Sequence, residues 1–554
     1  MSKKIRRHFR AEYVAASRTP PMISAWDDVP DVALRFRGVC CAELLFLSAM
    51  LVLPNGAAAQ VSVATWHNDL ARSGVNPHET ALTLANVKQS SFGKRCAYAV
   101  DGQIYAQPLY IPGVAMSGSK HNVVYVATEN DSVYAFDADC AQTTPLWHTS
   151  FLGPGITPMP CTSDRQPQCD VTIMSPEHGI SPTPVIDLAR GTIFVAAQSV
   201  EQNAYTQKLH ALDMATGLER PGSPVVISGS APGNPARKFD PEQAFQRAGL
   251  LLLQDVVYIP FASNDSSNGW MFGYGARALR QEFVFCVTPQ GQLGGIWGGG
   301  AAPAADRAGN IFAGTGNGSF DADKNGTNYG MSALRLSVSA DALSVADFFS
   351  PSHEAKLSSK DLDLDSGGLM LLPDQPGAHP HEAVIGFKTG YAFLLDRDHM
   401  GGLGTAHAVQ SFVANRGGIY SSFANWGSNV YLAGVDGHLT QWQLSGGLFP
   451  SAPTHQSAAT YNYPGATPSI SSNGARDGIV WTLETQGRVK GGKPAVLHAH
   501  AARDVSVELY NSTQAGARDA GGAGVKFSVP TVADGKVFVG TQTELDVYGL
   551  LKGL

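Results

Sequence analysis

The chain has 554 residues, of which 44% are hydrophobic and only 15% are charged. This balance excludes a disordered chain, and a net charge of −7 without a long basic run excludes a typical nucleic-acid-binding protein. The first 59 residues contribute +3 (eight Lys and Arg, five Asp and Glu), so residues 60–554 carry −10.

Residues 1–59 are predicted to be a signal peptide or leader. Arg35 and Arg37 precede an apolar run of ten residues, Leu44–Leu53, and the sequence "PNGAAAQ" then offers a small-residue cleavage site after Ala59. The run is too short to cross a bilayer comfortably. We therefore expect a periplasmic or secreted protein without a membrane span in its mature chain; an uncleaved membrane anchor is the alternative.

From residue 94 onward, one type of apolar strand returns throughout the chain, at separations of 47 to 72 residues. Each copy is followed by a second strand after a polar, Gly- or Asn-containing link, as a hairpin requires. Four copies are preceded by a stretch of small residues with proline, such as "SPTPVID" and "SVPTVAD". The eight copies are centred on Tyr125, Phe194, Tyr258, Phe312, Val384, Tyr431, Val480 and Phe538.

An irregular period of about this length is typical of a four-stranded sheet repeated with variable loops. One such sheet has two apolar faces, and radial packing of several sheets buries both. We therefore predict that residues 60–554 form a single domain of the all-β class, an eight-bladed β-propeller with four-stranded antiparallel blades. The strand-like segment Lys94–Tyr105 should complete the last blade and close the ring. Seven blades remain the alternative, if the units around Val384 and Val480 are insertions.

Five cysteines follow the leader: Cys96, Cys140, Cys161, Cys169 and Cys286. Cys161 and Cys169 share one polar, proline-bearing loop and are suspected to form a disulfide. Cys96 and Cys140 could pair if their strands meet. Cys286 alternates with phenylalanines in "FVFCVTP", which indicates a buried free thiol.

In a propeller, the loops that enter the innermost strands converge on the axis, where ligands bind. In this chain those loops carry polar and aromatic residues, which predicts a polar ligand site at the channel mouth. The alternative is structural, because charges near an axis can pair with one another. The candidate ligand-binding residues are Gln107, Glu177, His178, Arg247, Trp297, Asp365, Arg518 and Asp519, with Asp363 and Tyr463 beside them.

Two segments could bind a metal through carboxylates. In "DADKNGTNYG", Asp321, Asp323 and Asn325 alternate before a glycine, as calcium ligands do in an EF-hand loop, although Ser332 stands where a bidentate Glu would complete the set. A polar hairpin tip is the alternative for this segment. The second candidate is "DLDLDSGG", residues 361–368. Calcium is the metal that these patterns suggest.

His498 and His500, in "LHAHAA", would lie on one face of a strand because side chains alternate. Two imidazoles can hold zinc or copper, but a third ligand is not evident in the sequence. Histidines without a metal are therefore the favoured interpretation.

Two kinds of motif carry a family resemblance. "ALDMATG", residues 211–217, matches the Ala-x-Asp-x-x-Thr-Gly core of the pyrroloquinoline-quinone (PQQ) repeat, and Trp147 stands near the place of that repeat's docking tryptophan. The chain thus resembles the quinoprotein alcohol dehydrogenase-like propellers, which include BamB. Residues 67–83 and 511–542 resemble more closely a large, mostly uncharacterised group of exported bacterial propellers.

The resemblance implies an eight-bladed ring and, for the enzymes of the family, PQQ stacked on adjacent cysteines, calcium held by Glu and Asn, and an Asp as base. The only adjacent cysteines here are Cys40 and Cys41, inside the predicted leader. The sequence therefore argues against PQQ and favours a monomeric binding or interaction scaffold whose partner is an envelope protein or a polar small molecule. The runner-up is a PQQ-dependent alcohol or sugar dehydrogenase, and a hydrolase or lyase built from axial carboxylates is a third possibility.

Overall fold

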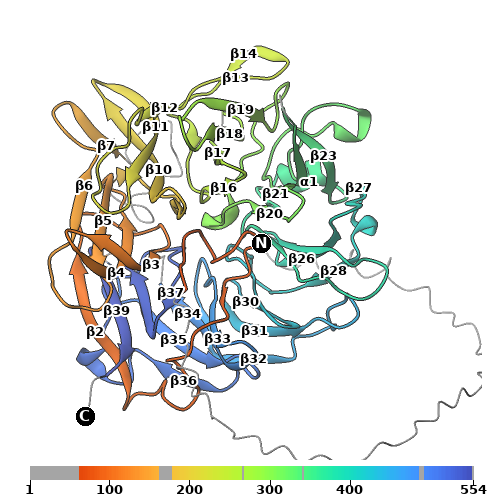
Figure 1. The fold of residues 1–554 in the computed structure, drawn as a ribbon. Helices are drawn as coiled ribbons and strands as arrows, with labels where there is room; N and C mark the ends of the chain where they lie inside the picture. Colours follow the sequence, from red (N-terminus) through yellow and green to blue (C-terminus); the bar gives the residue numbers. More distant parts are fainter. Residues whose placement is uncertain (1–60, 161–176, 265–266, 340–341, 486–491, 552–554) are drawn as a thin grey trace, which may run out of the picture. The chain divides into compact units, whose positions relative to one another are not determined.

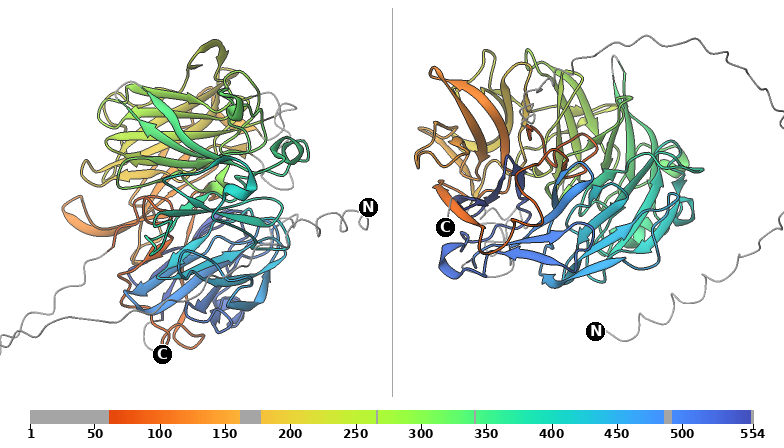
Figure 2. Two further views of the ribbon diagram at one scale, coloured as in Figure 1. Left: turned by 90° about the vertical axis from the view of Figure 1, so that its right-hand side faces the viewer. Right: turned by 60° about the horizontal axis from the view of Figure 1, so that its bottom comes forward.

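The computed structural model describes residues 61–160, 177–264, 267–339, 342–485 and 492–551, which belong to one compact unit. Eight mainly antiparallel sheets stand side by side around a common centre (Figure 1). The views in Figure 2 show the same ring from two further directions. The predicted eight-bladed propeller is therefore confirmed, and the seven-bladed alternative is wrong. No helix among the described residues is both long and apolar enough to cross a bilayer.

Blades 1 to 4 follow one another in the chain, and each begins with its innermost strand. Blade 1 contains β3 (Leu109–Met116), β4 (Ser119–Ala127), β5 (Ser132–Asp137) and β6 (Trp147–Ser150). Blade 2 contains β9 (Val185–Asp187), β10 (Thr192–Glu201), β11 (Ala204–Asp213) and β12 (Val225–Val226). Blade 3 contains β16 (Leu251–Leu253), β17 (Val256–Ser263), β18 (Trp270–Gly275) and β19 (Gln281–Cys286). Blade 4 contains β20 (Ala304–Ala305), β21 (Ile311–Gly314), β22 (Ala333–Val338) and β23 (Leu343–Ser350).

Blades 5 to 7 also begin with their innermost strands. The outermost strand of blade 8 comes from near the start of the described chain. Blade 5 contains β24 (Leu369–Leu371), β25 (Glu382–Gly386), β26 (Tyr391–Asp396) and β28 (Gln410–Val413). Blade 6 contains β29 (Ala424–Trp426), β30 (Asn429–Ala433), β31 (Gly437–Gln443) and β32 (His455–Tyr461). Blade 7 contains β33 (Ser469–Asn473), β34 (Arg476–Glu484), β35 (Val496–Ala501) and β36 (Glu508–Asn511). Blade 8 contains β37 (Thr531–Ala533), β38 (Lys536–Gly540), β39 (Glu544–Leu550) and β2 (Phe92–Ala99).

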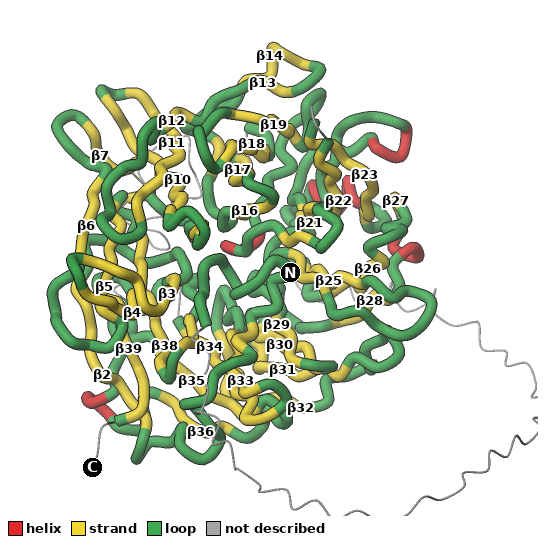
Figure 3. The backbone as a smooth tube through the Cα atoms, viewed as in Figure 1, coloured by secondary structure: helices red, strands yellow, loops and turns green. Residues whose placement is uncertain are grey.

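Most of the remaining strands are short additions to these sheets, and helix among the described residues is confined to a few short turns (Figure 3). The added strands are β1 (Val75–Asn76), β7 (Ile156–Pro160), β8 (Glu177–His178), β15 (Ala244–Phe245) and β27 (Gly402–Leu403), while β13 (Ser230–Ala231) and β14 (Asn234–Lys238) pair with each other as a separate hairpin. The helical turns are α1 (Glu354–Ser358) and the 3₁₀ turns η1 (Gly298–Gly300), η2 (Ala322–Lys324), η3 (Thr405–His407) and η4 (Gly516–Arg518).

The hydrophobic core is divided among the interfaces between neighbouring blades. Clusters of buried side chains fill the spaces between successive sheets, as between blades 4 and 5, where Phe349 and Phe393 have ring centroids 5.0 Å apart. Trp147 of blade 1 donates from Nε1 to the carbonyl of Met214 in blade 2, at 3.1 Å, as a docking tryptophan should. Because each blade covers its neighbour, both apolar faces of every sheet leave water, which is the main stabilising term of the ring.

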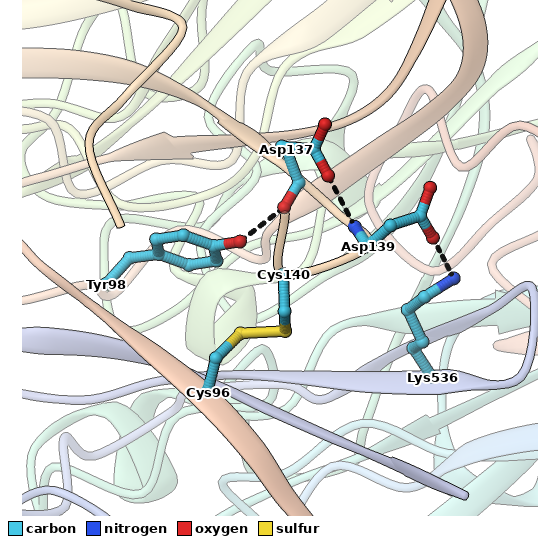
Figure 4. The surroundings of a disulfide bond; sticks show 6 residues. All are labelled: Cys96, Tyr98, Asp137, Asp139, Cys140 and Lys536. Atoms are coloured by element: carbon cyan, nitrogen blue, oxygen red, sulfur yellow. Dashed lines mark hydrogen bonds and ion pairs between the residues drawn. A yellow bond between two sulfur atoms is a disulfide. The ribbon is translucent and has the colours of Figure 1, made fainter. Parts of the chain in front are cut away.

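The ring closes where β2 pairs antiparallel with β39, as predicted from the segment Lys94–Tyr105. A disulfide between Cys96 in β2 and Cys140, just after β5, joins the closing strand to blade 1 (Figure 4). Lys536 of blade 8 adds a 2.7 Å ion pair with Asp139 across the same seam. Cys286 is a buried free thiol, as expected. The suspected pair Cys161 and Cys169 lies outside the described residues.

The centre of the ring is occupied by residues 61–79, here called the hub segment, which the sequence did not predict (Figure 1). The segment runs around the axis and hydrogen-bonds to seven of the eight innermost strands, while Trp66 packs against Gly249 of the remaining blade. Pairing this segment satisfies inner backbone groups that would otherwise be buried without partners. The bonded pairs are Val63 with Tyr110, Ala64 with Ile186, Leu70 with Ala305, Ala71 with Leu371, Ser73 with Asn425, Gly74 with Ile470 and Asn76 with Val532.

Candidate functional site

A pocket of about 280 Å³ lies where the loops that enter blades 3 to 8 converge; we call it the axial pocket. Its lining residues precede the innermost strands or sit in the inner turns, whereas the hub segment bonds to residues within those strands. The pocket therefore opens at the end of the axis where each innermost strand begins, and the hub segment fills the deeper part. Its walls include Arg247, Trp297, Asn317, Asp361, Asp363, Lys388, Tyr420, Tyr463 and Phe527.

A lysine and two carboxylates form the polar wall of the axial pocket. The Lys388 ammonium lies 2.6 Å from Asp363 Oδ2 and 2.8 Å from Asp361 Oδ1. Although burial opposes the charged form, these two carboxylates raise the pKa of Lys388 above its usual value. Asn317 joins the group, because its backbone N–H donates to Asp363 and its Nδ2 donates to Asp361 at 2.8 Å. The wall is thus a connected array of one cation, two carboxylates and an amide.

Asp365 lies beneath this wall and is almost completely buried. Its Oδ2 accepts the backbone N–H groups of Trp297 and Gly298 at 3.0 and 3.1 Å, while Oδ1 has no partner among the described residues. Burial raises the pKa of Asp365 to about 8 despite these two bonds. At neutral pH the group is therefore mainly protonated, and its free oxygen can donate or accept a proton.

The glycine run before blade 4 makes the tight turn at the base of the axial pocket. Gly299 has φ of 61°, and a Cβ there would lie 2.4 Å from the carbonyl oxygen of Tyr420. Only glycine fits a positive φ with such a close approach. The glycines before blade 4 thus form a turn toward the axis that no larger residue could make.

Arg247 is the cation on the opposite, aromatic side of the axial pocket. Its guanidinium carbon lies 4.0 Å from the centroid of the Phe527 ring and 5.9 Å from that of Phe245. Among the described residues no carboxylate forms an ion pair with it, and its buried Nη2 has no hydrogen-bond partner. A cation held on aromatic rings without a counter-ion is available to an anionic ligand.

A second polar group adjoins Arg247 on the side of blades 1 and 2. Glu129 is buried and accepts Gly179 N–H at 2.9 Å and the Ser181 hydroxyl at 2.7 Å, and burial raises its pKa to about 7. His178 lies 4.0 Å from this carboxylate, against Phe245, and burial lowers its pKa to about 3. Burial also raises the pKa of the half-buried Glu177. Burial therefore opposes the charged form of all three groups, and Glu129 is close enough to Arg247 for its carboxylate to favour the charged guanidinium.

Only some of the predicted ligand-binding residues lie together in the structure. Arg247, Trp297 and Tyr463 line the axial pocket with Asp363, and Asp365 lies below it. Gln107 belongs to the hub, since its Oε1 accepts the backbone N–H of His67 at 2.8 Å.

Arg518 and Asp519 lie at the outer edge of blade 8 rather than at the channel mouth. Asp519 accepts the backbone N–H of Lys94 in β2 and the hydroxyl of Tyr510, and Arg518 pairs with Asp519 at 2.7 Å. The expected axial position is wrong because the connection from β36 to β37 is long. Its early residues stay at the rim, and only Phe527 and its neighbours reach the axis.

The predicted calcium residues form a turn after blade 4's second strand. Asp321 accepts both the backbone N–H and the side-chain amide of Asn328, at 2.8 and 2.6 Å. Asp323 and Asn325 are exposed, and Asn325 has φ of 62°. The loop has the geometry of a polar turn, and calcium binding there stays a prediction.

Several pocket residues were not among the predicted ones, chief among them Asn317, Lys388, Tyr420 and Phe527. Asn317 and Lys388 follow the second strand of their blades, in inner turns that sequence reasoning had assigned only a hairpin role. Their one sequence signal is position, directly after the apolar runs around Phe312 and Val384. Tyr420 precedes the innermost strand β29, which is too short to be recognised.

A larger hollow of about 410 Å³ lies near the β13–β14 hairpin, between residues 236–241 and 267–270. It receives side chains from one region of the chain only, and none of the predicted site residues. The axial pocket, built by six blades, is therefore the better candidate for function.

No protein-family model matches the sequence, and no curated protein matches it. Solved structures do match the fold. The quinohemoprotein alcohol dehydrogenase of Comamonas testosteroni has a TM-score of 0.57 at 14% identity, over 90% of this chain and 82% of that one. The quinohemoprotein alcohol dehydrogenase ADHIIG of Pseudomonas putida HK5 has 0.56 at 13% identity, over 88% and 80%. A europium-containing methanol dehydrogenase has 0.55 at 12% identity, over 88% and 98%. The chain thus has the propeller fold of the quinoprotein alcohol dehydrogenases.

Proposed function

We propose that the protein binds a small, anionic molecule with a flat ring in the axial pocket. The observation that carries this proposal is Arg247, a pocket-lining guanidinium that stacks on Phe527 and forms no ion pair with a described carboxylate. A carboxylate or phosphate on the ligand would supply the missing counter-charge, and the aromatic side chains would cover the ring.

PQQ is one ligand of this class, because it is a flat quinone that carries carboxylates. Arg247 suits its carboxylates, and the unpartnered Asn317 Oδ1 is an oxygen of the kind that calcium takes as a ligand. A bound quinone would supply two-electron redox chemistry, with Asp363 and Asp365 placed to hold or move a proton. No pair of adjacent cysteines occurs within the described ranges to stack on it. A PQQ-dependent oxidoreductase is therefore the second candidate.

The experiment compares three probes on the purified chain: PQQ with calcium, pyridine-2,6-dicarboxylate as a flat dicarboxylate without redox activity, and glucose as a neutral polar molecule. Binding is measured by calorimetry and by quenching of tryptophan fluorescence. At least one of the two anions should bind, glucose should bind more weakly, and Arg247→Ala should weaken the anion at least about tenfold.

Arg277→Ala is the matched control, because the Arg277 side chain is 77% exposed and belongs to blade 3 like Arg247. Its affinity for the anions should equal that of the unaltered chain. Equal binding by Arg247→Ala, or no binding of either anion by the unaltered chain, would refute the proposal. Dye reduction with ethanol or glucose by the PQQ-loaded chain would establish the oxidoreductase.

Export, a monomeric state and an envelope-protein partner remain predictions from the sequence. They are compatible with a small-molecule site, because the axial pocket occupies one end of the ring and leaves the outer edges of the blades for other contacts.

A further inference from the structure

Blade 7 contains a cluster of metal-ligand side chains that is independent of the axial pocket. His498 and His500 are two residues apart on β35, so both side chains lie on one face of the sheet. Their rings are roughly parallel, with centroids 6.1 Å apart. The antiparallel strand β36 places Glu508 directly opposite His500. The third ligand that the sequence did not reveal therefore comes from the neighbouring strand.

The donor atoms of the three side chains lie within 4.8 Å of one another. His498 Nδ1 is 2.7 Å from Glu508 Oε1, and the other Glu508 oxygen accepts the side-chain amide of Asn511 at 3.0 Å. Donors held at about 2.0–2.2 Å by a tetrahedral zinc lie roughly 3.3 Å from one another, so the Glu508 oxygen has to move away from His498 Nδ1 by about half an ångström, while the donors that now lie farther apart, within the 4.8 Å limit, have to approach. The Glu508 side chain is 31% exposed and can make this movement.

His500 is the residue that points to a missing ligand. It is only 1% exposed, and neither ring nitrogen has a hydrogen-bond partner among the described residues. The backbone of Val505 is close enough to influence its pKa, but no hydrogen bond of acceptable geometry forms. A buried imidazole without partners is costly, and a metal ion on one nitrogen would remove that cost.

The surroundings agree with such a site. Glu484 places a further carboxylate oxygen 3.8 Å from His498 Nε2. The ring of Tyr461, on blade 6, covers the cluster edge-on, with its centroid 5.8 Å from that of His498. Two imidazoles and a carboxylate form a donor set that zinc and similar divalent metals prefer over calcium or magnesium.

We propose that His498, His500 and Glu508 bind one divalent transition-metal ion of the zinc type between strands β35 and β36. With three protein ligands, the fourth position is left to water or to another group, and the exposed side of Glu508 gives the ion its entry path. The ion would join the third and outermost strands of blade 7 through side chains in addition to their backbone hydrogen bonds.

The test uses the full chain after treatment with a chelator, titrated with zinc chloride in a calorimeter and with cobalt chloride in a visible spectrometer. One zinc ion per chain should bind, cobalt should give the absorption of a low-symmetry nitrogen and oxygen site, and zinc should raise the melting temperature. Glu508→Gln should weaken zinc at least about tenfold, because even supporting partners of metal ligands have effects of that size.

The control is His455→Ala, which alters an exposed histidine that pairs with Asp504 at 3.1 Å. It should bind zinc like the unaltered chain. The double variant His498→Ala/His500→Ala should lose the ion altogether; if it fails to fold, Glu508→Gln decides alone, because its side chain is partly in solvent. An absence of zinc binding, or unchanged binding and unchanged cobalt absorption in folded Glu508→Gln, would overturn the proposal.

Discussion

Arg72 donates two hydrogen bonds to one backbone carbonyl, that of Pro303, from Nε at 2.9 Å and from Nη2 at 2.7 Å. The two residues are 231 positions apart, and the arginine side chain is almost completely buried. Its Nη1 donates within the hub segment to Thr65 Oγ1 and to the carbonyls of Trp66 and Asp69. Burial lowers the pKa of Arg72 to about 10, which still leaves it charged at neutral pH.

Arg72→Ala is therefore expected to lower the free energy of unfolding by about 3 kcal/mol or more, because it leaves several buried carbonyls without donors. Arg72→Lys should recover only part of this, since an ammonium cannot reproduce the fork of donors. Urea unfolding followed by circular dichroism measures the effect. Arg277→Ala, at an exposed arginine, should differ from the unaltered chain by less than about 0.5 kcal/mol. An Arg72→Ala chain as stable as this control would show that the hub segment does not hold the ring.

Removal of the Cys96–Cys140 disulfide should destabilise the closing seam. The two cysteines are 44 residues apart, and the bond joins the outer strand of blade 8 to blade 1. A bridge over a loop of this length stabilises by about 2–4 kcal/mol. Cys96→Ser/Cys140→Ser should therefore melt several degrees lower than the unaltered chain, measured by scanning calorimetry under non-reducing conditions. Peptide mapping should find the cross-linked pair, and its absence from the oxidised protein would contradict the structure.

Asp365 should make the protein less stable as pH rises. Its folded pKa, about 8, exceeds its ordinary value of 3.8, so between these two values the folded state holds more protons than the unfolded state. Stability contributed by this group is therefore lost on going from acid to alkaline pH. Asp365→Asn removes the titration but keeps an oxygen for the two backbone N–H groups.

The measurement is the urea midpoint at about pH 5, 7 and 9, a range that spans most of the titration. The urea midpoint of Asp365→Asn should rise relative to that of the unaltered chain as the pH increases. Asp323→Asn, in an exposed turn, serves as the matched control and should follow the unaltered chain. Parallel curves for Asp365→Asn and the unaltered chain would contradict the raised pKa.

Gly217 should tolerate alanine poorly, for two separable reasons. Its φ is 71°, and a Cβ would lie 2.5 Å from Cε3 of Trp147, the docking tryptophan. Gly118 also has a positive φ, 85°, but a Cβ there would meet no atom within 4 Å. Gly118→Ala should therefore lower the free energy of unfolding by about 1 kcal/mol through the backbone alone, and Gly217→Ala should lower it by at least about twice as much.

A double-mutant cycle isolates the collision. In the chain that already carries Trp147→Ala, the added cost of Gly217→Ala should fall, because the obstructing ring is gone, but it should stay above that of Gly118→Ala, because the Cβ would still lie 2.8 Å from Thr149 Oγ1. The same cost with and without the tryptophan would mean that the steric argument is wrong.

The sequence predicted the strands that carry a long apolar alternation. All eight second strands, from β4 to β38, and their partners were recognised because each spans several buried residues. Four innermost strands were marked by small residues with proline, whereas others, such as the three-residue β29, left no pattern of their own. Trp147 was recognised because it stands near the place of the PQQ repeat's docking tryptophan. The closing strand β2 was recognised because it is a strand-like segment that precedes the first full repeat.

The hub segment and parts of both candidate sites were not predictable from local patterns. Residues 61–79 have no alternation, and their partners are distributed over blades hundreds of residues away. The inward course of a loop depends on its length, so Phe527 reached the axis and Arg518 did not. Glu508 became a ligand candidate only through the pairing register of β35 with β36, which single-strand patterns do not contain.

The position of the hub segment also has a consequence for the order of assembly. The hub segment leaves the ribosome before any blade does, and β2 is the next strand in the chain. The hub segment lacks its full set of partners until β37 has been made, and β2 lacks its partner until β39 has been made, so the first part of this domain to be synthesised is among the last to be placed. A chain that ended one blade early would leave both the hub segment and β2 without partners that they need.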